Sequence, residues 1–279
     1  SPHISIVTNI SPNHLDRHAD MDEYIQAKKT IISHQGSGDY ALLNYDDPEL
    51  RRWEKDCKGH VLWYSAKHTL ANGAFIKRND IVIAVDGKNT TIPCVSRIKI
   101  PGVHNLQNVL AASCAAYLAG AREQHIEKAI TTFSGLAHRL EFVREVNGVR
   151  YYNDSKATTP ESSIAAVTAF QAQVILIAGG YDKGSNFSEF AGVCAQHTKA
   201  VVLIGKTAGK IKELILEKKG SGETPSIFML KTFEEAFRQA NSLAKAGDVV
   251  LLSPACASYD MFLNYEERGR QFKDMIQAL

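Results

Sequence analysis

The densest group of hydrogen-bonding side chains lies in the stretch YYNDSKATTPESS, residues 151–163. It contains Asp154, Lys156 and Thr158, and apolar sequence lies on both sides of it. An amine and hydroxyls placed this close together can bind the phosphates or carboxylates of an anionic substrate. Turn formation and the start of a helix explain part of the same stretch, because Pro160 suits the first position of a helix.

Two further polar stretches follow apolar runs that resemble buried strands. GGYDKGSN, which contains Lys183, follows VILIA, and SPACASYDMF, which contains Ser258, follows VVLL. Ligands bind at the carboxyl ends of parallel strands, so we expect the three loops to converge on one edge of a sheet. Turn formation is the better explanation for any single loop, whereas three loops at one edge favour a binding site.

The order of the predicted elements indicates an α/β protein with two domains. In the first half we expect strands at 4–10, 41–44, 61–64, 74–77, 81–85 and 97–100, and helices at 20–32, 46–57, 104–119 and 125–133. In the second half we expect strands at 141–146, 149–152, 174–178, 200–204, 226–229 and 248–252, and helices near 187–194, from 207, at 233–244 and from 265. The second half therefore predicts a mainly parallel sheet covered by helices on both faces. The stretch SGLA at 134–137 indicates a joint, which gives predicted domains 1–135 and 136–279.

Composition excludes several classes of protein. The chain has 279 residues and a formal net charge of only +2, which argues against nucleic acid or an anionic membrane as the main partner. No apolar run approaches the roughly 18 residues of a membrane-spanning helix. The five cysteines are scattered and contain no CxxC pair, which indicates reduced thiols in the cytoplasm rather than disulfides or a zinc site.

One stretch resembles a phosphate-binding loop but lacks a required glycine. Residues 204–210 read IGKTAGK, and the glycine that should stand five positions before Gly205 is Ala200, inside a predicted strand. We therefore interpret this stretch as a turn from a strand to a helix.

The first half has polar groups of its own. TNISPNHLDRH places His14 after the opening strand, and the helix that follows contains YIQAKK with Lys28. GVHNLQN places Asn108 near a helix start, where its amide can hydrogen-bond an adenine edge or cap the helix. Taken alone, His14 is better explained as a cap or surface residue, and Lys28 as part of a solvated helix face.

Seven stretches occur in a fixed order: TNISPNHLDRH, YIQAK, PGVHNLQNVLAA, FSGLAHRLE, YYNDSKATTPES, AGGYDKG and LLSPACASYDMFLNYEERG. In this order the chain resembles the Mur ligases of peptidoglycan synthesis over essentially its whole length. NDSKAT and SPACAS resemble the members that add D-glutamate. The resemblance implies a remnant of the central ATPase domain followed by a Rossmann-like C-terminal domain. It also implies that the family's phosphate-binding loop, a metal-binding glutamate and the UDP-binding domain lie upstream, so we expect this chain to be a fragment.

The activity implied by the resemblance is the ATP- and Mg²⁺-dependent joining of D-glutamate to UDP-N-acetylmuramoyl-L-alanine through an acyl phosphate. This is a step of bacterial cell-wall synthesis in the cytoplasm and is linked to cell shape and division. We expect neither nucleic acid nor membrane insertion, and a monomer or a pairing with the missing N-terminal part. We expect the isolated fragment to be inactive. The alternatives are a sister Mur ligase, a ligase similar to folylpolyglutamate synthetase, or a non-catalytic binding module.

The resemblance also implies roles for individual residues. Lys28, His14 and Lys156 would be catalytic, with His14 and a carbamylated Lys28 holding magnesium. Lys29 competes with Lys28 for this assignment, and the spacing from Tyr24 favours Lys28. ATP would be bound by Asn108, Arg139, Asp154 and Lys156. D-glutamate would be bound by Thr158, Lys183, Ser258 and Tyr265, the last of which stands where many relatives are expected to have Phe.

Overall fold

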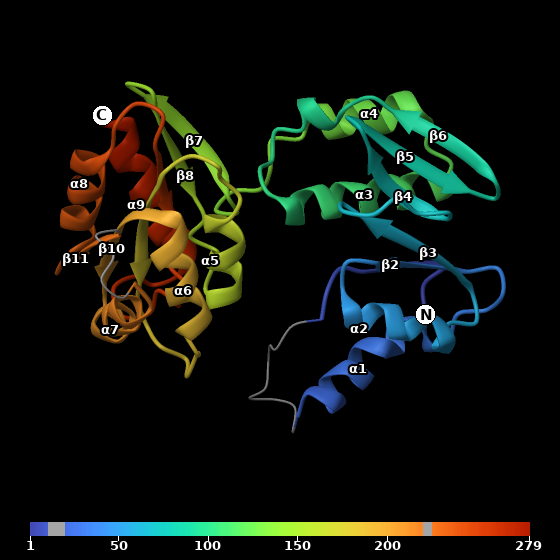
Figure 1. Ribbon diagram of the computed structural model, residues 1–279, viewed down its shortest axis with the longest axis horizontal. Helices are drawn as coiled ribbons and strands as arrows, with labels where there is room; N and C mark the ends of the chain where they lie inside the picture. Colours follow the sequence, from blue (N-terminus) through green and yellow to red (C-terminus); the bar gives the residue numbers. More distant parts are fainter. Residues whose placement is uncertain (11–19, 220–224) are drawn as a thin grey trace. The chain divides into compact units, whose positions relative to one another are not determined.

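The computed structural model describes residues 1–10, 20–219 and 225–279 (Figure 1). The chain divides into two compact units. Unit 1 contains Ser1–Lys99 and Val103–Phe133, and unit 2 contains Ile100–Gly102 and Ser134–Leu279. Each unit is built on one six-stranded, mostly parallel sheet, so the predicted α/β fold class is confirmed.

The sheet of unit 1 follows the chain order β1-β2-β3-β4-β5-β6. Its strands are β1 (Ile4–Val7), β2 (Tyr40–Asn44), β3 (His60–Ser65), β4 (Gly73–Lys77), β5 (Asp80–Val85) and β6 (Lys88–Ile92). The first four run parallel, and β5 and β6 add antiparallel hairpins. The β5–β6 turn is Asp86-Gly87 with φ of 50° and 73°, the left-handed conformation that a two-residue hairpin loop requires.

The helices of unit 1 are α1 (Met21–Ser33), α2 (Pro48–Arg51), α3 (Val103–Leu118) and α4 (Glu123–Thr132). Aspartate side chains cap the first two. The Asp20 side chain accepts a hydrogen bond from the Glu23 amide and caps α1. Asp47 caps α2, whose first residue is Pro48, and Trp53 just beyond this helix is fully buried against Leu43 of β2.

Two predictions for unit 1 were wrong. The helix predicted at 46–57 is the single turn α2 followed by a 3-10 turn, Arg52–Asp56. The strand predicted at 97–100 does not form, because Val95–Arg97 makes a 3-10 turn and the sheet edge is occupied by β6. The sequence of β6, KNTTI, is mostly polar and exposed, so its pattern gave no sign of a strand.

The sheet of unit 2 has the order β11-β10-β9-β12-β8-β7, and only β7 runs antiparallel to its neighbour. The strands are β7 (Glu141–Val146), β8 (Val149–Asn153), β9 (Val174–Gly179), β10 (Thr198–Ile204), β11 (Ser226–Met229) and β12 (Val249–Leu252). Every residue of the central strands β9 and β12 is buried. Full burial of each Val, Leu or Ile stabilises the fold by roughly 1.5–3 kcal/mol, so these two strands form the centre of the core.

Helices cover both faces of this sheet, as the sequence predicts (Figure 1). One core contains residues of α5 (Pro160–Val167), α6 (Ser188–His197) and α7 (Ala208–Lys219). The other contains residues of α8 (Phe233–Leu243) and α9 (Tyr265–Gln277). No helix among the described residues is both long and apolar enough to cross a membrane.

Candidate functional site

The three polar loops of unit 2 meet at the carboxyl edge of its sheet. Strands β9, β12 and β8 are parallel neighbours, so their carboxyl ends lie side by side. The loops after β9 and β12 are bonded to each other, since the Tyr181 amide donates to the Ala257 carbonyl oxygen at 2.9 Å. The loop after β8 is bonded through the Asp154 amide, which donates to the Leu252 carbonyl at 2.8 Å. The predicted convergence is confirmed.

Asp154 is a buried carboxylate at the end of β8. Its Oδ1 accepts a hydrogen bond from the Leu140 amide at 3.0 Å, and its Oδ2 accepts one from the Ser253 hydroxyl at 2.8 Å. The Ser253 oxygen also lies 2.9 Å from the Ser163 hydroxyl. Burial raises the pKa of Asp154 to about 7, and the two hydrogen bonds and the charge of Arg139 offset only part of this effect.

Arg139 lies in a short segment that is bonded to the loop after β8. The Leu140 amide donates to Asp154, and the His138 carbonyl accepts from the Lys156 amide at 3.0 Å. His138 and Leu140 have φ of 62° and 44°, a left-handed conformation that is uncommon outside glycine and especially so for Leu140. These contacts hold the exposed Arg139 next to the loop that carries Lys156.

Lys156 and Tyr265 lie together. Lys156 is exposed, and its Nζ is 5.8 Å from the centre of the Tyr265 ring. Tyr265 is the first residue of α9, which Asn264 caps. The Ser155 hydroxyl donates to the Tyr265 carbonyl at 2.8 Å, so the loop after β8 is fixed to the start of this helix. Thr158 is half-buried in the same loop, and its amide donates to the Lys156 carbonyl at 2.9 Å.

Sequence reasoning missed Arg268, the most buried charged group at this edge. It is 1% exposed and makes no ion pair with any described residue. Its guanidinium donates to the Ser155 carbonyl at 2.8 Å, to the Ser155 hydroxyl at 3.0 Å and to the Cys256 carbonyl at 3.3 Å. The available signal was helical spacing, because Arg268 lies one and two turns before the buried residues Phe272 and Ile276. Burial lowers the pKa of Arg268 to about 10, which leaves it charged at neutral pH.

Lys183 and Ser258 come from the loops after β9 and β12. Lys183 is exposed, and its Nζ is 5.5 Å from the centre of the Tyr259 ring. Ser258 is 3% exposed, and its hydroxyl makes no hydrogen bond with any described residue. The two residues therefore offer an amine and a hydroxyl on adjoining loops.

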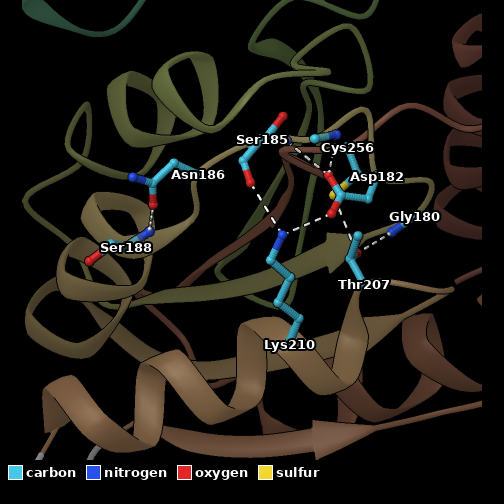
Figure 2. Close-up of polar contacts among 9 residues, drawn as sticks. Gly180, Asp182, Ser185, Asn186, Ser188, Thr207, Lys210 and Cys256 are labelled. Carbon is cyan, nitrogen blue, oxygen red and sulfur yellow. Dashed lines mark hydrogen bonds and ion pairs between the residues drawn. The ribbon is translucent and has the colours of Figure 1, made fainter.

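The interpretation of IGKTAGK as a turn is confirmed. Strand β10 ends at Ile204 and α7 begins at Ala208, so Gly205-Lys206-Thr207 connects them. Figure 2 shows the contacts that Thr207 and Lys210 make with the loops after β9 and β12.

In unit 1 the chain that follows β1 is bonded to the ends of β2 and β3. The Asn44 side-chain amide donates to the Thr8 carbonyl at 2.9 Å, and the Tyr64 hydroxyl donates to the Val7 carbonyl at 2.9 Å. The Ile10 amide donates to the Asp47 carboxylate at 2.8 Å. His14, predicted as a magnesium ligand, lies outside the described residues.

Asn108 lies on the first turns of α3 and is exposed. Its neighbour Gln107 donates to Asp46 Oδ2 at 2.9 Å, and the Ser65 hydroxyl donates to Asp46 Oδ1 at 2.6 Å. Burial alone would raise the pKa of Asp46, but hydrogen bonds from Ser65, Gln107 and the Ala66 amide outweigh it and keep that pKa below its usual value. Sequence reasoning missed Asp46 and Gln107, which fix the start of α3 to the ends of β2 and β3.

Lys28 and Lys29 face different surroundings on α1. Lys28 is exposed, and its Nζ is 5.3 Å from the centre of the Tyr24 ring. Lys29 makes an ion pair with Asp56 at 2.6 Å and also lies over the Trp53 ring. The described residues contain no group of three or more His, Cys, Asp or Glu side chains arranged to hold a metal ion.

Family comparisons cover most of the chain. Residues 1–116 match the model of the Mur ligase middle domain, and residues 138–256 match that of the Mur ligase glutamate ligase domain. A protein of Thermoanaerobacter sp. (strain X514) named UDP-N-acetylmuramoylalanine--D-glutamate ligase is 47% identical over 278 residues, which is 100% of this chain and 61% of the relative. A protein of the same name from Clostridioides difficile (strain 630) is 40% identical over 280 residues, covering 100% of this chain and 60% of the relative.

Solved structures share the fold. MurF from Acinetobacter baumannii matches with a TM-score of 0.70 at 14% identity, over 99% of this chain and 60% of that one. MurF from Thermotoga maritima, solved in complex with ADP, matches with a TM-score of 0.68 at 18% identity, over 99% and 63%. The chain thus spans about 60% of the length of the proteins it matches. Because the two Mur ligase domain models match consecutive parts of it and close relatives match it from end to end, the chain belongs to the Mur ligase family.

Proposed function

We propose that the protein joins D-glutamate to UDP-N-acetylmuramoyl-L-alanine by forming an amide bond, with ATP as the phosphoryl donor. The observation that carries this proposal is the 47% identity, over the whole chain, to a relative named as the D-glutamate ligase. The cluster of cationic and hydroxyl groups at the carboxyl edge of unit 2 supports it, because both a nucleotide and D-glutamate are anionic.

The proposed reaction has two steps. A carboxylate oxygen of UDP-N-acetylmuramoyl-L-alanine attacks the γ-phosphorus of ATP, the bond to the β-phosphate oxygen breaks, and ADP leaves. The neutral amine of D-glutamate then attacks the carbonyl carbon of the acyl phosphate, phosphate leaves with the bonding electron pair, and the nitrogen loses a proton. Both steps depend on positioning and on neutralising negative charge, which protein cations provide.

On the nucleotide side, Asn108 would contact adenine, Asp154 the ribose, and Arg139 and Lys156 the phosphates. The exposure of Arg139 and Lys156 and the bonded backbone on which they stand support a role in binding phosphate. Asp154 is only 6% exposed and each of its oxygens already accepts one hydrogen bond. A ribose contact would therefore use a remaining lone pair of this carboxylate.

On the amino-acid side, Thr158, Lys183, Ser258 and Tyr265 would bind D-glutamate. An amine and a hydroxyl on adjoining loops suit a ligand that carries two carboxylates. Lys156 lies against the Tyr265 ring, so the two proposed ligand sites share one border in unit 2.

In unit 1, Lys28 would be carbamylated and would hold magnesium together with His14. When bound, magnesium would neutralise the charge that develops on the transferred phosphoryl group. The Lys29 amine is occupied by its ion pair with Asp56 at 2.6 Å, whereas Lys28 is exposed and accessible to CO₂, which favours Lys28 for this role.

The test is phosphate release by the full-length protein with ATP, Mg²⁺ and UDP-N-acetylmuramoyl-L-alanine. We expect release to depend on D-glutamate and to be absent with L-lysine or meso-diaminopimelate. Absence of release with D-glutamate, or equal release with another amino acid, would refute the assignment. Incubation with ¹³C-labelled bicarbonate should give one carbamate NMR signal, which Lys28→Met removes and Lys29→Met keeps.

We further propose that residues 1–279 taken alone do not turn over these substrates, because the relatives that carry the activity are longer. The same assay on residues 1–279 and on the full-length protein compares the two directly. Turnover by residues 1–279 at the full-length rate would contradict this part of the proposal and leave the reaction itself in place.

A further inference from the structure

The stretch IGKTAGK, residues 204–210, resembles a phosphate-binding loop but is not one. Its side chains hold the loops that carry Lys183 and Ser258 in place. The Gly180 amide donates to the Thr207 hydroxyl at 3.0 Å, and the same hydroxyl lies 3.3 Å from the Cys256 sulfur (Figure 2). Thr207 and Cys256 are buried. The first turn after β10 is therefore fixed both to the loop after β9 and to the loop after β12.

Lys210, one turn into α7, closes the loop after β9. Its Nζ donates to Asp182 Oδ2 at 2.9 Å and to the Ser185 carbonyl at 3.3 Å, and it lies 5.1 Å from the centre of the Phe187 ring. Figure 2 shows this amine between the Asp182 carboxylate and Ser185. The other carboxylate oxygen, Asp182 Oδ1, accepts hydrogen bonds from the amides of Gly184 and Ser185 at 2.8 and 3.0 Å.

Lys183 lies inside this bonded loop. The carboxylate of Asp182, the residue before Lys183, accepts hydrogen bonds from the amides of Gly184 and Ser185, the two residues after Lys183. These contacts enclose the backbone of Lys183. The side chain of Lys183 is left outside and exposed.

Besides making these hydrogen bonds, Lys210 carries a positive charge that acts on Asp182. An ionised Asp182 next to Lys183 would cancel the attraction of Lys183 for an anion. Burial alone would raise the pKa of Asp182, but the hydrogen bonds from Lys210 and the two amides outweigh it and keep that pKa below its usual value. Asp182 is therefore ionised at neutral pH, and Lys210 supplies the charge that neutralises it.

We propose that Lys210 is a positioning residue for Lys183. It holds the loop after β9 in its bonded form and neutralises Asp182, so that Lys183 presents an uncompensated positive charge to a substrate carboxylate. This inference rests on the proposed function, in which Lys183 binds D-glutamate.

The test compares three variants of the full-length protein. Lys210→Gln removes the charge, Lys210→Arg keeps it, and Lys212→Gln removes a lysine from another face of the same helix as a matched control. The Lys210 and Asp182 side chains are 49% and 31% exposed, so loss of this pair should leave the melting temperature nearly unchanged. In Lys210→Gln we expect the KM for D-glutamate to rise about twofold to fivefold, with the KM for ATP unchanged. Lys210→Arg and Lys212→Gln should retain the wild-type KM.

A second readout does not depend on activity. Hydrogen exchange at the amides of Gly184 and Ser185 should be faster in Lys210→Gln than in wild type and unchanged in Lys212→Gln, because Lys210 fixes the carboxylate that accepts these amides. An unchanged KM for D-glutamate in Lys210→Gln, or an equal rise in Lys212→Gln, would overturn the inference. A wild-type protein that does not use D-glutamate would refute the proposed function instead, and the exchange result would still report whether Lys210 braces the loop.

Discussion

Replacing Asp154 by Asn should stabilise unit 2 at neutral and alkaline pH while it weakens the proposed contact with ATP. The folded protein holds Asp154 where burial raises its pKa from 3.8 to about 7. A protonated Asp154, or an Asn amide in its place, can donate to the Ser253 hydroxyl, which then donates to Ser163. The Leu140 amide keeps its acceptor in both cases. The substitution therefore removes a buried charge, keeps the acceptor of the Leu140 amide and pairs one of the two N–H groups of the Asn side chain.

The magnitude follows from the two pKa values. At about 1.4 kcal/mol per pH unit, the difference between 3.8 and about 7 corresponds to roughly 4 kcal/mol, an upper bound on the cost of keeping Asp154 ionised in the fold. Between about pH 4 and pH 7 the folded state binds more protons at Asp154 than the unfolded chain does. Stability therefore falls as the pH rises through this window and is constant above it. We expect Asp154→Asn to gain roughly 2–4 kcal/mol at pH 8 and almost nothing near pH 4.

Hydrogen exchange of the β9 and β12 amides in urea is the suitable assay. Both tryptophans, Trp53 and Trp63, lie in unit 1, so their fluorescence does not report on unit 2. The matched control is Asp248→Asn. Asp248 is also buried but pairs with Lys199 at 2.6 Å, so this variant should be less stable than wild type at pH 8. The reasoning is refuted if Asp154→Asn is less stable than wild type at pH 8, or if both proteins show the same dependence of stability on pH.

Three further predictions concern stability, turnover and thiol reactivity. In Gly269→Ala the added Cβ would lie 2.1 Å from His138 Nδ1, so we expect a loss of roughly 1–3 kcal/mol in urea unfolding. Gly209→Ala on α7 meets no atom within 4 Å and should gain about 0.5–1 kcal/mol in the same measurement; a loss equal to that of Gly269→Ala would contradict the steric argument. In the full-length protein, Lys156→Ala should lower turnover at least about tenfold with little change in melting temperature, and the reverse pattern would make the loop purely structural. With a thiol reagent on the native protein, Cys57 should react first, since the other four cysteines are buried. The prediction is wrong if mass mapping finds the first adduct on another cysteine.

The sequence predicted those parts of the fold that local patterns determine. The strands 141–146 and 226–229 were predicted with their observed ends, because each contains apolar residues and is flanked by turn residues. The convergence of the loops that carry Lys156, Lys183 and Ser258 also followed, since it requires only that their strands be parallel neighbours. Sequence reasoning failed for β6, where pairing with β5 makes a strand from a polar stretch with no pattern of its own.

The supporting residues of the site were harder to predict than the residues that would touch substrate. Gln107 and Asp46 are 61 positions apart, and Arg268 and Ser155 are 113 apart, so their contacts depend on the complete fold. Arg268 was missed for a second reason, since a charged residue in a polar helix is usually solvated. Only its spacing relative to the buried Phe272 and Ile276 distinguished it from its neighbours.

The site in unit 2 separates into two classes of residue that should respond differently to substitution. Lys156, Lys183 and Arg139 are exposed, so the fold gains little from them and their loss should weaken ligand binding alone. Arg268 and Thr207 are buried and hydrogen-bonded to the loops that carry these cations. Their loss should lower both stability and ligand binding, because it leaves buried carbonyl and amide groups unpaired and frees the loop backbone. Lys210 departs from this division, since it is half-exposed yet acts on the loop backbone. The result that identifies its role is therefore a change in substrate KM together with faster hydrogen exchange at Gly184 and Ser185, without a change in stability.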